Sequence, residues 1–146
     1  LVVRLMEEDH DEATAKEIMQ QFAAYVFRIH QKGIVYRDMN GGNVMVSLNE
    51  ATGRYKFELI DTNRALIHDE EALVPMEECT RDLTLMNPRM QLVEFFIGEY
   101  LRCRGIYSEA EVERIVNIQR QRQGKKHSVK KFIKRYRKRY YSWLEK

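Results

Sequence analysis

The chain has 146 residues, of which 44% are hydrophobic and 32% charged, and its formal net charge is +3. This composition is that of one ordinary globular domain, and no apolar stretch approaches the roughly 18 residues that a membrane span needs. The opening residues turn acidic at once and carry no signal-peptide pattern. Cys79 and Cys103 lack metal-ligand spacing, which favours reduced thiols in a cytoplasmic protein.

Charge is distributed unevenly along the chain. Residues 125–146 carry ten Lys or Arg against one Glu, whereas residues 1–124 carry fifteen Lys or Arg and twenty-one Asp or Glu. A mildly acidic body therefore precedes a tail of about +9. Such a tail predicts an anionic partner: phosphate, nucleic acid or an anionic membrane surface. No nucleic-acid motif accompanies the charges, so we expect no nucleic-acid partner.

The first elements in chain order are a short strand and a helix. Residues 1–6 are apolar and strand-like. Residues 12–32 place apolar side chains such as Ile18 and Phe22 at helical spacing, and Gly33 is a typical residue to end a helix. This pattern predicts a helix with one buried face.

A loop and a β-hairpin follow. Residues 34–43 lack periodicity and are rich in Asn and Gly, which predicts a loop. Residues 44–61 contain two apolar runs, over 44–48 and 55–61, joined by a polar turn, and therefore predict a hairpin. Residues 62–80 show no regular pattern and are expected to be irregular.

The remainder is predicted to be helical, over residues 81–124 and 127–146. The first of these regions is expected to start between residues 81 and 88, to break at Gly105, and to continue as a helix over about 109–122. The last helix is basic and carries an aromatic stripe on one face, which favours docking of that stripe on the body. The predicted fold class is mainly α, of the α+β type, with a short hairpin beside the loop at 34–43.

Four polar residues in the loop and hairpin form a set suited to phosphoryl transfer. That reaction needs a carboxylate within reach of the attacking hydroxyl and oxygen ligands for Mg²⁺ at the phosphates of ATP. Asp38 fits the first role, and Asn43 with Asp61 fits the second, because the hairpin returns Asp61 to the loop. Asn40 is a candidate to orient the acceptor hydroxyl or the γ-phosphate.

Each of these residues also has a purely structural interpretation. Asp38 could bond its own backbone, as Asp often does in a turn rich in Gly and Asn, while Asn43 and Asp61 could cap a turn and a strand. The spacing favours catalysis for the first and metal binding for the other two. Arg37 is expected to brace the loop more than to contact substrate, and Arg64 is either a surface ion pair or a contact to an acceptor phosphate.

Two further groups also have more than one interpretation. Arg81 and Asp82 are expected to form an ion pair at a helix start or to brace the loop. In the basic tail, a solvated face is the plain interpretation, and the alternative is contact with anionic lipid or with substrate phosphates. The candidates for such contacts are Lys134, Arg135 and Lys138.

The loop and hairpin together resemble the kinase superfamily. The segment from Tyr36 to Asn43 is similar to the kinase catalytic loop, with Tyr36 in place of the usual His, and Asp61-Thr62-Asn63 stands where protein kinases have Asp-Phe-Gly. The resemblance covers about residues 10–65. Asn40 replaces the Lys that protein kinases usually carry, and no Ala-Pro-Glu segment follows, which argues against a protein substrate.

The closest pattern is that of the lipopolysaccharide core kinases, which act on Kdo or heptose sugars. Asp-Leu-Asn-x-x-Asn and Leu-Ile-Asp-Phe-Asp-Arg are typical of that family, and this chain has similar segments over residues 38–43 and 59–64. Residues 79–83 are also similar to the segment that opens the family's next long helix. The resemblance implies ATP- and Mg²⁺-dependent transfer to a sugar hydroxyl of a lipid-linked acceptor at the cytoplasmic face of the inner membrane.

The elements that grip ATP in such enzymes precede the hinge strand, and this chain contains none of them. If residues 1–6 are that strand, the chain corresponds to the carboxyl-terminal lobe, its partner is the missing amino-terminal lobe, and the lobe alone is expected to have little activity. Two alternatives stay open: another small-molecule kinase, of the aminoglycoside or choline type, and a pseudokinase or scaffold that binds anionic surfaces.

Overall fold

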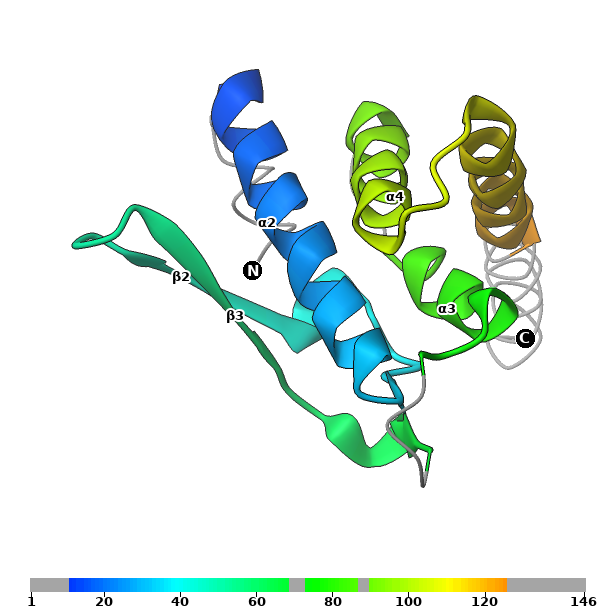
Figure 1. Ribbon diagram of the computed structural model, residues 1–146, viewed down its shortest axis with the longest axis horizontal. Helices are drawn as coiled ribbons and strands as arrows, with labels where there is room; N and C mark the ends of the chain where they lie inside the picture. The colour runs from blue at the N-terminus through cyan, green and yellow to red at the C-terminus, as the bar shows by residue number, and fades with distance from the viewer. Residues whose placement is uncertain (1–10, 69–72, 87–89, 126–146) are drawn as a thin grey trace, which may run out of the picture.

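The computed structural model describes residues 11–68, 73–86 and 90–125 of the chain. Helices predominate among them, accompanied by two small antiparallel sheets (Figure 1). This α+β arrangement agrees with the predicted fold class. The strand predicted for residues 1–6 and the basic helix predicted for 127–146 lie outside the described residues.

Helix α2, Glu12–Gln31, begins and ends where local signals place it. The Asp11 carboxylate accepts a hydrogen bond of 2.8 Å from the backbone amide of Thr14, a typical N-cap. Gly33 follows the helix with φ of 73°, in the left-handed region that glycine adopts without a steric cost. The predicted range of 12–32 differs from α2 by one residue.

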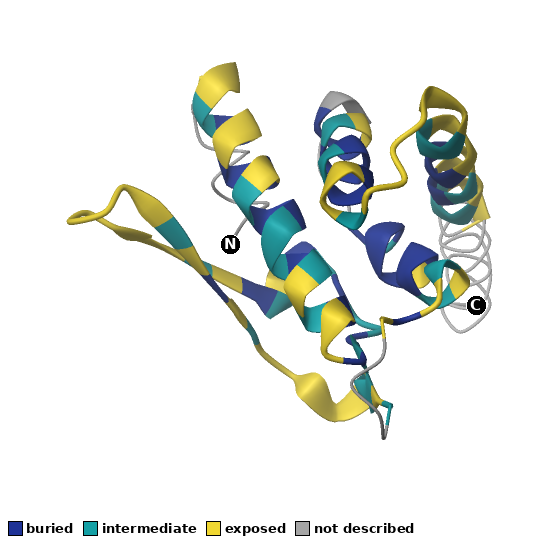
Figure 2. Cartoon of the chain, viewed as in Figure 1, coloured by how far each residue is buried: buried dark blue, intermediate teal, exposed yellow. Residues whose placement is uncertain are grey.

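Helix α4, Met90–Arg104, lies beside α2, and their buried faces are turned toward each other (Figures 1 and 2). Helix α3, Met76–Leu83, lies close to the carboxyl-terminal end of α4, and a further helix covers residues 109–125. The predicted start of the helical region, between 81 and 88, is wrong, because α3 begins at Met76 within the segment expected to be irregular. Among the described residues, no helix is both long and apolar enough to cross a bilayer.

Strands β2, Val44–Asn49, and β3, Arg54–Leu59, form the hairpin, which projects from one side of α2 (Figure 1). Its inner face reaches the core through Phe57, whose ring centroid lies 5.0 Å from that of Phe22 on α2. Phe22 in turn lies 5.5 Å from Phe96 on α4. Aromatic packing therefore joins the hairpin to both long helices, and pairs of this kind add about 0.5–1.5 kcal/mol each beyond area burial.

A second, two-stranded sheet is formed by the start of the predicted loop and a later segment of the chain. Strand β1, Ile34–Val35, pairs antiparallel with β4, Leu66–Ile67. The short 3₁₀ segments η1, Gly41–Asn43, and η2, Thr62–Arg64, lie directly before β2 and before β4. The stretch predicted as loop over 34–43 therefore starts as a strand, and the end of the hairpin returns beside it.

Candidate active site

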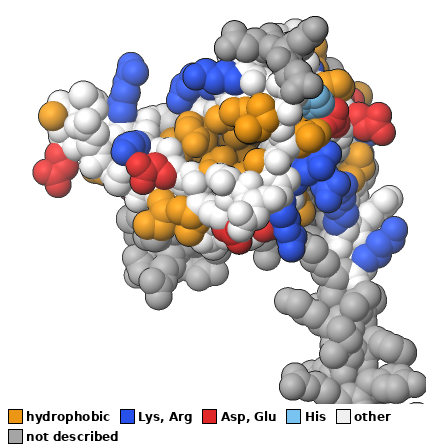
Figure 3. All heavy atoms as spheres, turned by 90° about the horizontal axis from the view of Figure 1, so that it is seen from below, with side chains coloured by type: hydrophobic (Ala, Val, Ile, Leu, Met, Phe, Trp, Pro, Cys, Tyr) orange, Lys and Arg blue, Asp and Glu red, His pale blue; other side chains and the backbone are white. Residues whose placement is uncertain are grey.

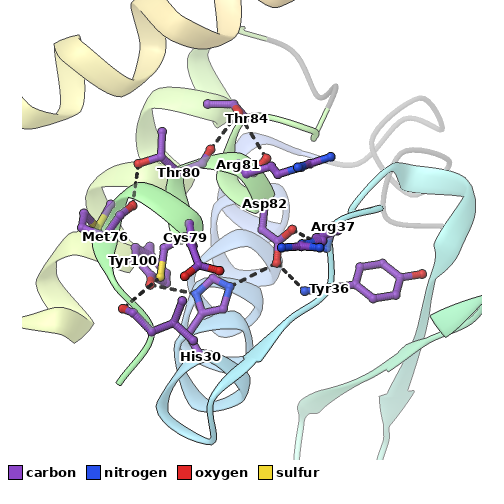
Figure 4. Close-up of polar contacts among 12 residues, drawn as sticks. His30, Tyr36, Arg37, Met76, Cys79, Thr80, Arg81, Asp82, Thr84 and Tyr100 are labelled. Carbon is purple, nitrogen blue, oxygen red and sulfur yellow. Dashed lines mark hydrogen bonds and ion pairs between the residues drawn. The ribbon is translucent and has the colours of Figure 1, made fainter. Parts of the chain in front are cut away.

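The backbone just before Asp38 is anchored on a buried carboxylate. The amides of Tyr36 and Arg37 donate hydrogen bonds to Oδ2 and Oδ1 of Asp82 on α3, at 2.7 and 2.6 Å, as Figure 4 shows. Arg37 has φ of 65°, a left-handed conformation that costs free energy in a non-glycine residue and persists only where neighbours enforce it. The expectation that Asp82 braces the loop is confirmed.

Asp38 itself is held by two asparagines of the same loop. Asn40 Nδ2 donates to the Asp38 carboxylate at 3.1 Å, and Asn43 Nδ2 donates to the Asp38 carbonyl at 3.2 Å. The oxygen of Asn40 accepts from the amide of Gly42, where a Cβ would lie only 3.2 Å from that oxygen. The Asp38 side chain remains 22% exposed, so its carboxylate is positioned and yet accessible.

The end of the hairpin brings Asp61 to this loop. The amide of Ile60 donates to the Asn43 carbonyl at 3.0 Å, which ties the two segments together. Asp61 is exposed, has left-handed backbone angles of φ 58° and ψ 64°, and accepts a hydrogen bond of 2.8 Å from Asn63 Nδ2. Arg64 follows, and its Nη1 lies 3.9 Å from Oδ2 of Asp38.

Tyr36 connects the loop to the end of the hairpin. Its side chain is buried, and its hydroxyl donates to the carbonyl of Ile60 and lies 3.4 Å from the carbonyl of Asp61. Burial raises the pKa of the Tyr36 phenol, and the charges of Asp38 and Asp61 raise it further. The phenol therefore stays protonated and able to donate. Sequence reasoning noted Tyr36 only as a replacement for His and missed this contact, which depends on how far the ring reaches in three dimensions.

His30 lies behind Asp82 and was also missed. Its Nε2 is 3.2 Å from Oδ2 of Asp82, and both side chains are fully buried. Burial lowers the pKa of His30, but hydrogen bonds to Asp82 and Cys79 outweigh burial and raise it overall. The only sequence signal was a histidine on the buried face of the predicted helix, which does not by itself identify its partner.

The metal-binding hypothesis rests on Asn43 and Asp61. Among the described residues, no group of three or more His, Cys, Asp or Glu side chains is arranged to hold a metal ion. Asn43 commits its nitrogen to the Asp38 carbonyl, so its amide oxygen can face a ligand, and Asp61 presents an exposed carboxylate. One amide and one carboxylate oxygen fit Mg²⁺, which keeps several waters and takes its other ligands from phosphates.

The structure thus brings together most of the predicted site residues: Asp38, Asn40, Asn43, Asp61 and Arg64. Arg37 contributes its backbone amide, and its buried Nε has no hydrogen-bond partner among the described residues. The candidate anion contacts Lys134, Arg135 and Lys138 lie outside the described residues.

Comparisons with known proteins bear on the fold. No protein-family model and no curated protein matches the chain. Among solved structures, a similar one is "WaaP in complex with acyl carrier protein", with a TM-score of 0.55 and 18% sequence identity. The fold is similar to that of WaaP. The match covers 80% of this chain and 54% of the WaaP chain, so this chain spans little more than half the length of that protein.

Proposed function

We propose that this chain carries the catalytic loop and metal ligands of an ATP- and Mg²⁺-dependent phosphotransferase. Its acceptor is a sugar hydroxyl of the lipopolysaccharide inner core, on Kdo or heptose. The observation that carries the proposal is the convergence of Asp38, Asn43 and Asp61: Asn43 bonds the Asp38 backbone, and the residue before Asp61 bonds Asn43.

In this proposal Asp38 accepts, or orients through a hydrogen bond, the proton of the acceptor hydroxyl. Asn40 donates to Oδ1 of the carboxylate, and Oδ2, on the side of Arg64, would face the acceptor. Arg64 reaches the same carboxylate at 3.9 Å with a side chain that is 73% exposed, and its guanidinium is suited to contact a phosphate on the acceptor or on the nucleotide. Proton transfer by a positioned carboxylate typically contributes about 10²–10⁴-fold in rate.

Asn43 and Asp61 would hold Mg²⁺ against the phosphates. Bound there, the ion neutralises charge on the phosphates and orients them for transfer. The protein's own contribution is to fix the two ligands relative to Asp38, through the Asn43 contacts and the Tyr36 hydroxyl.

The partner beside this site is proposed to be a preceding lobe of the same protein. Hydrophobic side chains gather on one face of the described residues beside the projecting hairpin (Figure 3). Met45, two residues after Asn43, and Ile60, directly before Asp61, are 40% and 45% exposed. Apolar side chains at the rim of a polar site suit a surface that a further part of the protein and the nucleotide cover.

The support for the acceptor class comes from the sequence. The segments over residues 38–43 and 59–64 resemble those of lipopolysaccharide core kinases. A lipid-linked acceptor places the enzyme at the cytoplasmic side of the inner membrane. The excess of Lys and Arg over residues 125–146 suits peripheral attachment to anionic lipid there.

The test uses the protein with its amino-terminal lobe restored, labelled ATP, and a panel of core glycolipids, aminoglycosides and choline. We expect transfer to a core glycolipid, and we expect Asp38→Ala to lower kcat by at least about 100-fold, the scale of lost general-base catalysis. Glu50→Ala, in the exposed hairpin turn, is the matched control and should retain wild-type turnover.

Each other outcome points to a different function. Transfer to an amine or a soluble sugar alone would identify another small-molecule kinase. Absence of both transfer and Mg²⁺-ATP binding would identify a pseudokinase or scaffold. Wild-type turnover by Asp38→Ala would remove that residue from the mechanism.

A further inference from the structure

A chain of polar side chains runs through the interior from α4 to the catalytic loop. It starts at Arg104, in the last turn of α4, whose Nη1 lies 3.3 Å from the hydroxyl of Tyr100 and whose Nη2 donates to the Val74 carbonyl at 2.7 Å. Tyr100, one helical turn earlier, is fully buried. Its hydroxyl lies 2.8 Å from Nδ1 of His30 on α2.

His30 Nε2 lies within hydrogen-bond distance of Asp82. The Asp82 carboxylate in turn accepts hydrogen bonds from the amides of Tyr36 and Arg37. Figure 4 shows Tyr100, His30 and Asp82 in this order, with the loop backbone at its end. Three helices and the loop therefore meet through this line of hydrogen bonds, beside which Cys79 Sγ on α3 lies 3.3 Å from Arg104 Nη1. The last of these bonds lies one residue before Asp38.

The donors and acceptors along this line fit only one consistent direction when His30 is neutral. An ionised Asp82 only accepts, so His30 must carry its proton on Nε2. Nδ1 is then the acceptor for the Tyr100 hydroxyl proton, and the Tyr100 oxygen accepts from Arg104. When His30 is protonated, Nδ1 donates to Tyr100 instead, and the contact between Nε2 and Asp82 is unchanged.

The line joins a positively charged side chain, Arg104, to a carboxylate, Asp82. Among the described residues, Arg104 forms no ion pair within 4 Å with an Asp or Glu, and Asp82 has His30 as its one ion-pairing group. The guanidinium reaches the line through the Tyr100 hydroxyl, and the buried carboxylate reaches it through His30. In a low-dielectric interior, aligned hydrogen bonds polarise and strengthen one another, and loss of one link weakens the rest.

We propose that Arg104 and Tyr100 are positioning residues for the catalytic loop. Through His30 they fix Asp82, and through Asp82 they fix the left-handed backbone that presents Asp38. Neither side chain needs to touch substrate or nucleotide. Only the activity measurement below depends on the proposed phosphotransferase function.

The structural test is amide hydrogen exchange, measured by NMR on the 146-residue chain. Tyr100→Phe removes one hydroxyl and keeps the ring, and Arg104→Met removes the guanidinium. We expect each variant to speed exchange at Tyr36 and Arg37 on the order of tenfold more than at core amides of α2, which is the signature of local opening. Arg102→Met is the matched control, because Arg102 lies on the same helix and stacks on Tyr107 away from this line.

If the two side chains only stabilise the fold, the variants should lower protection throughout α2 by the same factor as at the loop. That uniform loss would overturn the proposal. Unchanged exchange at Tyr36 and Arg37 would also overturn it. If Tyr100→Phe does not fold, Arg104→Met and Arg104→Lys carry the same test, with Lys expected to restore part of the protection. The side-chain ¹⁵N shifts of His30 provide a second readout. They should report a proton on Nε2 in the wild type.

Activity gives a separate readout in the protein with its amino-terminal lobe restored. Arg104→Met is expected to lower kcat by about tenfold, since one misplaced catalytic group costs on this scale or more, with little change in the KM for ATP. If no acceptor is phosphorylated by the wild type, the proposed function fails while the exchange result still decides the positioning role.

Discussion

The two sides of the candidate site are built differently. On the loop side, the backbone before Asp38 is bonded to a fully buried carboxylate, which is itself backed by a buried histidine. On the strand side, Asp61 is exposed and its carboxylate accepts a hydrogen bond from Asn63, and the Arg64 side chain is 73% exposed. The fold thus fixes the backbone that carries the proposed catalytic carboxylate, and it leaves the proposed metal ligand exposed to what binds there.

The largest expected effect is on the free energy of unfolding, which should respond differently to a substitution on each side of the site. Asp82→Asn replaces an acceptor of the two loop amides with an N–H donor in a buried position, and we expect it to lower the free energy of unfolding by roughly 3 kcal/mol. Asp61→Asn is the matched change on the exposed side. It should stay within about 0.5 kcal/mol, because Asn tolerates left-handed backbone as Asp does.

Urea unfolding followed by circular dichroism measures both variants. If Asp82→Asn and Asp61→Asn lose the same free energy of unfolding, the contrast between the buried loop side and the exposed strand side is wrong.

A smaller effect is expected at the connection between the sides. Tyr36→Phe removes the hydroxyl that donates to the Ile60 carbonyl and should cost about 1 kcal/mol, since a partly buried hydrogen bond is lost. Tyr107→Phe, at an exposed tyrosine, should change stability by less than about 0.5 kcal/mol. Thermal unfolding of the pair checks this, and an unchanged melting temperature for Tyr36→Phe would show that the two sides are independent.

The smallest effect is a pH dependence on the loop side. His30 faces Asp82 and Cys79 from α3 and Tyr100 from α4, with Arg104 beyond, and its pKa is raised by the net effect of these contacts over burial. A raised pKa in the folded state stabilises the fold fully below the unfolded pKa of about 6.5 and loses that contribution as the pH rises through the folded value. Stability should therefore decline above pH 6.5.

His30→Gln should remove this part of the pH profile, even if it lowers stability at every pH. Unfolding measured in steps from pH 5.5 to 8.5 tests it, and an identical slope in wild type and variant would assign the titration to another group.

Elements set by local signals could be predicted from the sequence. The cap at Asp11 and the stop at Gly33 define α2 to within a residue. The two apolar runs joined by a polar turn give the hairpin over Val44–Asn49 and Arg54–Leu59, with small shifts at its ends. Helix α3 was missed although Pro75 with two following glutamates marks a helix start. The eight residues of α3 are too few to show the long apolar stripe that predicts the other helices.

Contacts between distant segments could not be predicted. Strands β1 and β4 have two residues each, too short for any periodicity, and they form because the chain returns past the loop. The spacing of Asp38 and Asn43 suggested a site, whereas the link between His30 and Asp82 joins residues 52 positions apart. Nothing in local pattern or composition specifies such a pairing.

The most direct test of the central claim is where a divalent ion binds. Mn²⁺ as a probe for Mg²⁺, titrated at substoichiometric concentration with ATP into the ¹⁵N-labelled chain, broadens the amides closest to it. The account predicts that Asn43 and Asp61 broaden first, that Asp38 follows, and that Asp61→Asn abolishes the effect. Broadening confined to the glutamates of the helix over 109–125, with no change at Asn43 and Asp61, would contradict it.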